Sequence, residues 1–86
     1  MPTIAEVDGT RIMMFPFDHD PPHVHAFGAD FRVNLAVSDA RVLETRGTIG
    51  PAVMRRLRLW VLRHRSRLSQ LWMDARRGNP ITRIEE

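Results

Sequence analysis

At 86 residues, the chain has room for a single domain with a small core, so we expect a protein partner or a homo-oligomer to add to its stability. The absence of cysteine excludes disulfides and thiolate metal sites. No apolar run reaches the roughly 18 residues of a membrane-spanning helix, and no leader-like segment opens the chain. We therefore expect a soluble, cytoplasmic protein without membrane contact.

Positive charge is concentrated in the second half of the chain. Every basic residue is an arginine. Residues 51–77 hold eight arginines and one acidic residue, Asp74, which gives this segment a net charge of +7. The other residues hold five arginines and nine acidic residues, a net charge of −4. The sequence thus combines a mildly acidic first half with a strongly basic second half.

Residues 1–47 have the pattern of β-strands joined by short turns. Asp8-Gly9 is typical of a tight hairpin turn, and Pro16, which lacks an amide proton, should end the pairing of the second strand. In the fourth segment apolar and polar residues alternate, as in a half-buried strand. The predicted strands cover residues 3–7, 11–17, 23–27, 31–37 and 41–45.

Residues 50–78 have the pattern of helices, because apolar residues recur every three or four positions. Pro51 fits a first helical turn, and Gly78 to Pro80 end the helical pattern. A single helix of about 27 residues would be unusually long, so we expect a break near residues 64–66. Residues 79–86 form a tail that adds a short strand or stays loose.

These patterns predict an α+β fold in one domain spanning residues 1–86. An antiparallel sheet of three to five strands comes first, and two C-terminal helices pack on one of its faces. Both tryptophans fall on the apolar helical stripe, which favours a role in the core. The predicted buried set is Ile4, Ile12, Met14, Phe31 or its neighbours, Val33, Leu35, Val53, Leu57, Trp60, Val61, Leu68, Leu71 and Trp72.

The segment "FDHDPPHVHAFG", residues 17–28, holds three of the four histidines. On a strand, His23 and His25 point to the same face, about 6.5 to 7 Å apart along the backbone. Two such imidazoles can chelate a divalent transition metal, with His19 folding over from the loop as a third ligand. Asp18 and Asp20 could orient an imidazole or donate an oxygen ligand.

The same histidines allow two other interpretations. Without a metal, His23 and His25 could share acid and base catalysis on RNA, although no separate nucleophile accompanies them. Alternatively, His23 and His25 are half-exposed strand residues, and Pro21 and Pro22 only stiffen the turn that precedes them.

The arginines of the helical segment also have more than one interpretation. Arg56, Arg63 and Arg67 lie opposite the apolar stripe, where they could track the phosphates of RNA or DNA. They could also form the solvated side of an amphipathic helix, or bind an acidic partner protein. No recognition-helix motif or glycine-rich phosphate loop supports nucleic-acid binding.

The sequence resembles a small bacterial family classed as a domain of unknown function. The resemblance covers about residues 1–78 and includes "MPTI" and the motif D-H-x-P-P-H-V-H, with phenylalanine just before it. It also includes the proline that opens the helical part and a closing L-x-x-L-W. It implies a β-then-α layout and a partner encoded nearby, because genes of this family often occur in pairs resembling toxin–antitoxin modules. The positions that match its signature are Asp18, His19, Pro21, Pro22, His23 and His25.

Departures from the family pattern are Gly50, where serine is usual before the helix proline, His64, where asparagine is usual, and the many helical arginines. The sequence leads to three functional hypotheses. The chain is a protein-interaction or regulatory subunit of a toxin–antitoxin-like module. Alternatively, it is an RNA-cleaving toxin that uses His23 and His25, or a metal-binding domain built on His19, His23 and His25.

Overall fold

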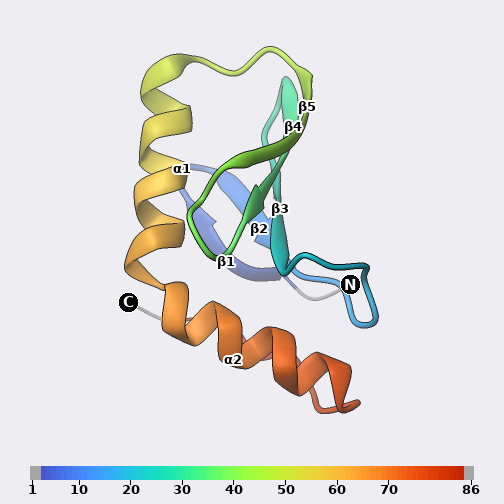
Figure 1. Cartoon of the computed structure of the whole chain (residues 1–86). Coiled ribbons are helices and arrows are strands. Elements are labelled where there is room, and N and C mark those ends of the chain that lie inside the picture. The colour runs from blue at the N-terminus through green and yellow to red at the C-terminus, as the bar shows by residue number, and fades with distance from the viewer. Residues whose placement is uncertain (1–2, 85–86) are drawn as a thin grey trace.

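The computed structural model describes residues 3–84. Within this range the chain forms a five-stranded antiparallel sheet followed by two helices, which confirms the predicted α+β fold (Figure 1). The strands lie side by side in chain order, as a simple meander. The elements are β1 Thr3–Val7, β2 Thr10–Met13, β3 His23–Phe27, β4 Phe31–Ala36, β5 Val42–Gly47, α1 Pro51–Arg63 and α2 Arg65–Arg76.

The β1–β2 hairpin turns at Asp8-Gly9, as predicted. Both residues have positive φ, 50° and 79°, which matches the two-residue turn that continues the twist of antiparallel strands. β2 is shorter than the predicted run over residues 11–17. It ends at Met13, which pairs with His25. The chain then leaves the sheet ahead of Pro16, and a long loop leads to β3.

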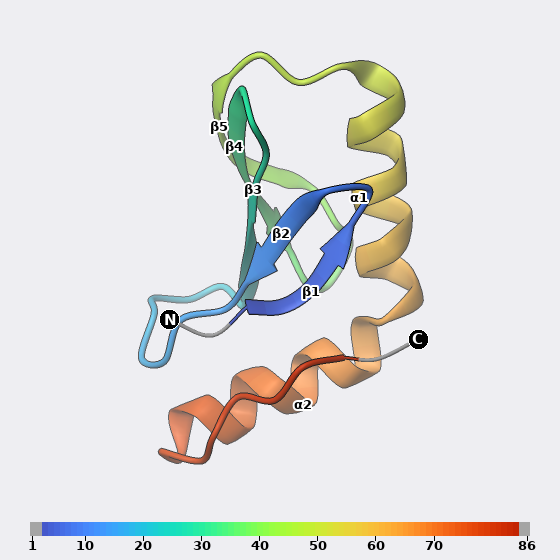
Figure 2. The ribbon, with the colours of Figure 1, turned by 180° about the vertical axis from the view of Figure 1, so that it is seen from behind.

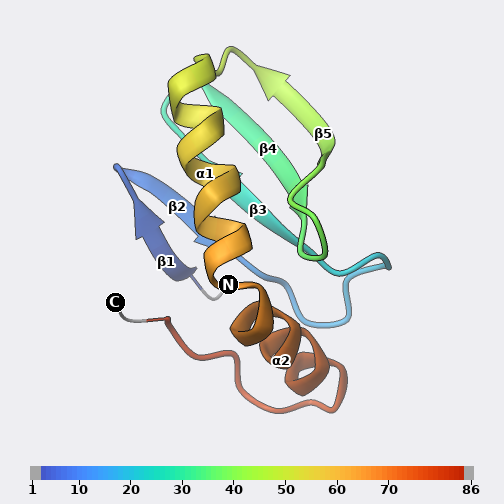
Figure 3. The same cartoon turned by 60° about the vertical axis from the view of Figure 1, so that its left-hand side comes forward.

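The pairing of β3 with β4 assigns their side chains to two faces of the sheet. Val24 pairs with Leu35, and both belong to the hydrophobic core. Because side chains alternate along a strand, His23, His25 and Phe27 point to the opposite face. Figure 3 shows α1 lying across the core face, so the histidines are on the face away from α1.

The two helices meet at His64, inside the predicted break. This residue has φ −103° and ψ 18°, and its amide still donates a hydrogen bond to the Trp60 carbonyl at 3.1 Å. α2 therefore leaves at an angle and runs beyond the end of the sheet near the β2–β3 loop (Figures 1 and 2). Trp72 of α2 reaches β3, where its ring centroid lies 5.3 Å from that of His23.

The core lies between the sheet and the helices and follows the predicted set with two exceptions. Phe31 and Val53, at the first position of β4 and in the first turn of α1, are only partly buried and pack against the edge of the core. Both tryptophans are buried, as expected, at 5% exposure. The fully or nearly buried predicted residues are Ile4, Ile12, Met14, Val33, Leu35, Leu57, Trp60, Val61, Leu68, Leu71 and Trp72.

The chain after α2 is irregular but packs back on the domain. The Ile84 amide donates to the Ile4 carbonyl at 2.7 Å, and Arg67 donates to the Thr82 hydroxyl at 2.9 Å. The last positions of the predicted tail, 85 and 86, lie outside the described residues. Over residues 3–84, neither helix combines the length and apolar character needed to cross a bilayer.

Candidate functional site

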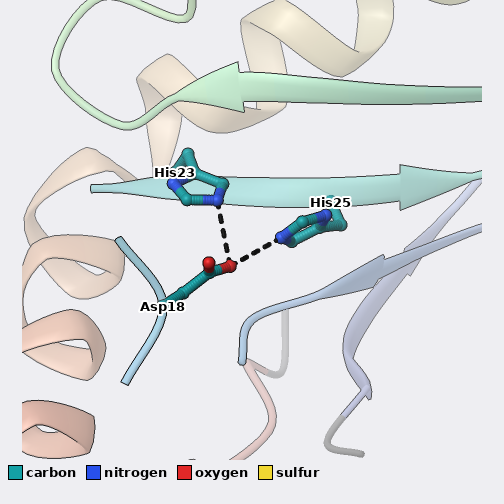
Figure 4. Close-up of side chains that lie close together, drawn as sticks. All are labelled: Asp18, His23 and His25. Carbon is teal, nitrogen blue, oxygen red and sulfur yellow. Dashed lines mark hydrogen bonds and ion pairs between the residues drawn. The ribbon is translucent and has the colours of Figure 1, made fainter. Parts of the chain in front are cut away.

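Two imidazoles and one carboxylate converge at the start of β3, on the sheet face away from α1 (Figure 4). Nε2 of His23 lies 3.0 Å from Oδ2 of Asp18, and Nε2 of His25 lies 2.9 Å from the same oxygen. The ring centroids of the two histidines are 4.9 Å apart. We call Asp18, His23 and His25 the His–Asp cluster.

The β2–β3 loop holds the Asp18 side chain beneath β3. The His19 amide donates to Oδ1 of Asp18 at 2.9 Å, so this oxygen is occupied while Oδ2 faces the histidines. Arg76, near the end of α2, donates to the Asp18 carbonyl at 2.8 Å and to the Asp20 carboxylate at 3.0 Å. The second helix thereby fastens a loop that is remote in sequence. Within the loop, the Asp20–Pro21 peptide bond is cis.

His23 is held in a defined tautomer. Its Nδ1 lies 2.7 Å from the Pro21 carbonyl oxygen, which can only accept a hydrogen bond, so Nδ1 carries a proton. The side chain is 1% exposed, and Nε2 has no aligned hydrogen bond to any residue within 3–84 despite its closeness to Asp18. A buried ring nitrogen without an aligned hydrogen bond thus faces a carboxylate oxygen.

His25 is less enclosed, with 15% of its side chain exposed. Its Nε2 makes a hydrogen bond to Oδ2 of Asp18, a pairing in which the ring nitrogen donates. Phe15 meets the imidazole edge-on at 4.6 Å between centroids, and Phe27 lies nearly parallel to it at 6.3 Å. These aromatic neighbours fix the ring plane and leave one side open.

The His–Asp cluster keeps Asp18 ionised. Burial by itself raises the pKa of the Asp18 carboxyl, but the hydrogen bond from His25 and that from the His19 amide act in the other direction. Together with the positive charge of the imidazoles, they hold the pKa below its ordinary value of 3.8. At neutral pH the site therefore offers a carboxylate oxygen beside two imidazole nitrogens.

The structure brings together only part of the predicted ligand set. His19 lies beside the His–Asp cluster, with its ring centroid 5.2 Å from that of His23, but its side chain is 83% exposed. The group of converging ligand atoms found within residues 3–84 contains Asp18 and does not include His19. The third converging ligand atom therefore comes from Asp18, which the sequence offered as an oxygen ligand, and not from His19.

The other predicted site residues have structural contacts. Pro21 supplies the carbonyl that orients His23, and the Pro22 carbonyl accepts the Val37 amide at 2.9 Å. Arg56 of α1 pairs with Asp8 in the β1–β2 turn, and Arg67 contacts Thr82. Arg63 is exposed on α1.

Sequence reasoning missed the side chains that surround the cluster. Arg76 fastens the Asp18 loop, and Phe15 and Phe27 flank His25. Phe27 alternates with His25 along β3, so the strand pattern already contained the signal for its position. The contact of Arg76 joins segments that are far apart in the chain, and no local pattern indicates it.

Comparison with curated proteins and with solved structures gives no match. A family model does match, over residues 9–73, and this span includes the His–Asp cluster, the sheet from the first turn onward and most of the helical part. Because the match covers well over half of the chain, the protein belongs to the family described as domain of unknown function DUF4160.

Proposed function

We propose that this protein binds a divalent transition metal through the His–Asp cluster. The supporting observation is the buried Nε2 of His23, which faces the ionised Asp18 carboxylate at 3.0 Å without an aligned hydrogen bond in the described chain. A buried polar atom without a hydrogen bond is costly. A cation bound by this nitrogen and the carboxylate oxygen would remove that cost.

The ligand set suits a metal that accepts mixed nitrogen and oxygen donors. Two imidazoles and a carboxylate form the facial arrangement of many non-haem iron sites, and zinc, nickel and manganese accept the same donors. His23 already has the second contact typical of a metal-bound histidine, since its other nitrogen donates to a carbonyl. Such a metal would keep open positions and act as a Lewis acid.

Metal binding is favoured over acid–base cleavage of RNA by His23 and His25. A proton-shuttling residue must reach its substrate within hydrogen-bonding distance. The His23 ring is 1% exposed and lies against Trp72. A substrate in solution therefore has access to His25 but not to both imidazoles, whereas a metal ion is small enough to reach both.

The test is calorimetric titration of untagged protein with Zn²⁺, Ni²⁺ and Mn²⁺. We expect binding of about one equivalent and a loss of about 100-fold in affinity or more in His23→Asn, which keeps the donor to Pro21 but lacks Nε2. His19→Ala is the matched control, because His19 is a neighbouring histidine outside the cluster. Absence of binding, or an equal loss in His19→Ala, would contradict the proposal.

A second candidate function is that of a protein-interaction subunit of a two-gene, toxin–antitoxin-like module. It is supported by the outer side of α1, where Leu59 and Leu62 are 57% and 39% exposed beside Arg55 and Arg58. With Pro51 and Met54, these side chains line a groove of about 420 Å³. Apolar residues flanked by arginines suit a partner helix that is apolar and acidic.

Co-expression with the product of the neighbouring gene, followed by size-exclusion chromatography, tests this second function. We expect co-elution that Leu62→Glu abolishes and that Leu43→Glu, an exposed change on β5, leaves intact. Elution of the protein alone as a dimer that Leu62→Glu dissociates would instead assign the groove to a homo-oligomer. A monomer that ignores its neighbour would remove the interaction function.

A further inference from the structure

Asp18 and His25 also line an open pocket of about 360 Å³ on the sheet face away from α1. This volume falls within the range of sites for small organic ligands, about 300 to 1,000 Å³. The other main lining residues are three phenylalanines and one arginine: Phe15, Phe17, Phe27 and Arg32. The pocket therefore joins the His–Asp cluster to an aromatic wall and a cation.

Arg32 supplies the cation on the far side of the pocket. Its guanidinium carbon lies 5.7 Å from the centre of the Phe27 ring, the residue with which it pairs across β3 and β4. In the described part of the chain Arg32 makes no ion pair, and the nearby carboxylate of Glu44 is bound to Arg46 at 2.9 Å. With the hydrogen bond from Arg46, the charge of Arg32 helps to hold the pKa of the Glu44 carboxyl below its ordinary value, but the Arg32 guanidinium has no ion-pair partner among residues 3–84 and can pair with an anion.

Phe17 lines the pocket although both its exposure and its backbone conformation are unfavourable. Its side chain is 72% exposed, and its backbone has φ 61°, a left-handed conformation that a bulky residue rarely adopts. Neither feature helps the chain to fold. Strained residues of this kind concentrate at ligand-binding sites, so the exposed ring indicates that the loop contacts a ligand.

We propose that the pocket binds a phosphate linked to a planar ring, as in a nucleoside monophosphate. The ring packs against the phenylalanines, since such stacking accepts any planar base. The phosphate lies between Arg32, whose planar fork matches phosphate oxygens, and the metal held by Asp18 and His25. This ligand assignment rests on the proposed metal-binding function and specifies the substrate class of the same site.

The test is calorimetric titration of the metal-loaded full chain with adenosine 5′-monophosphate, adenosine and inorganic phosphate. Because the pocket contacts both halves of the ligand, the nucleotide should bind at least about tenfold tighter than either half. Equal affinity for the nucleotide and inorganic phosphate would overturn the role of the aromatic wall. A 5′-phosphorylated RNA oligonucleotide provides a further arm: tighter binding than the free nucleotide assigns the ligand to a strand end, and weaker binding to a free nucleotide.

Two substitutions locate the ligand. Arg32→Gln should lower nucleotide affinity about tenfold and leave binding of adenosine unchanged, whereas Arg41→Gln, the same change at an exposed arginine that pairs with Asp39, should have no effect. Phe17→Asn removes the ring and keeps a residue that tolerates the left-handed backbone. This substitution should lower the affinity for the nucleotide without lowering the midpoint of thermal unfolding or the affinity for the metal. Unchanged nucleotide binding in both Arg32→Gln and Phe17→Asn would overturn the assignment.

Titration with EDTA separates this inference from the metal proposal. If the metal binds and the nucleotide does not, the ligand assignment is wrong and the metal proposal stands. If the nucleotide binds equally well in the presence of EDTA and in His23→Asn, the metal does not contact the phosphate, and that part of the ligand assignment is wrong. Loss of nucleotide binding in EDTA, restored by added Zn²⁺, supports both.

Discussion

The sheet face that α1 covers and the face that carries the histidines bury their side chains in different ways. On the covered face, Val24, Val33 and Leu35 are fully buried against α1 and contribute to one hydrophobic core. The edge strand β5 is exposed on both faces along its length. On the face opposite α1, Arg32 of β4 is also exposed. Burial there is confined to the corner where the Asp18 loop and Trp72 enclose His23.

The covered face therefore supplies the apolar burial that stabilises the fold, whereas the enclosed corner buries a polar ring. A chain shaped by stability alone would have an apolar residue in the position of His23. Instead that position holds a nitrogen that lacks an aligned hydrogen bond among residues 3–84. Local features that conflict with stability concentrate at functional sites, so the corner is where chemistry is expected.

The largest effect that separates the two faces should come from the covered one. Leu57→Ala removes a side chain that is 1% exposed and should lower the free energy of unfolding by about 2 to 5 kcal/mol. Leu59→Ala is the same change on the same helix at a residue that is 57% exposed, and it should cost no more than about 0.5 kcal/mol. Urea unfolding measures both, and equal losses would show that α1 does not complete the core through Leu57.

Much of this fold could be predicted from the sequence because local rules determine it. Asp8-Gly9 specifies a tight turn, and the two-residue period of β3 puts His23 and His25 on one face. The helix break near residue 64 followed from length alone. Local patterns could not show that Phe31 and Val53 are only partly buried, because their burial depends on how far β4 and α1 extend beyond the neighbouring elements.

The composition of the site was less predictable because it depends on a loop. Asp18 and His19 are adjacent, and which of them turns toward β3 is decided by the loop path. That path follows from the positive φ of Phe17 and from hydrogen bonds donated by Arg76 to Asp18 and Asp20. The contact with Arg76 spans 58 residues of sequence, beyond the reach of any periodic pattern.

An intermediate effect should come from the metal at the enclosed corner. At about 100 times its dissociation constant, Zn²⁺ should raise the free energy of unfolding by about 2.7 kcal/mol, because the folded chain binds it and the unfolded chain does not. Urea unfolding with Zn²⁺ and with EDTA measures the change. His19→Ala should retain it and His23→Asn should lose it. A stabilisation that survives in His23→Asn would assign the metal to other residues.

The smallest of these effects should be the dependence of stability on acid at Asp18, on the sheet face away from α1. Since the pKa of Asp18 is held below 3.8 in the folded chain, its contribution to stability is complete above the pKa of the unfolded chain and is lost as the pH falls through the folded pKa. With EDTA present, the stability difference between the wild-type protein and Asp18→Asn should therefore shrink below about pH 4. The difference for Leu57→Ala should stay constant, because neither residue titrates. Parallel curves for both substitutions would mean that the imidazoles do not stabilise the Asp18 carboxylate, and the two faces would then differ in packing alone.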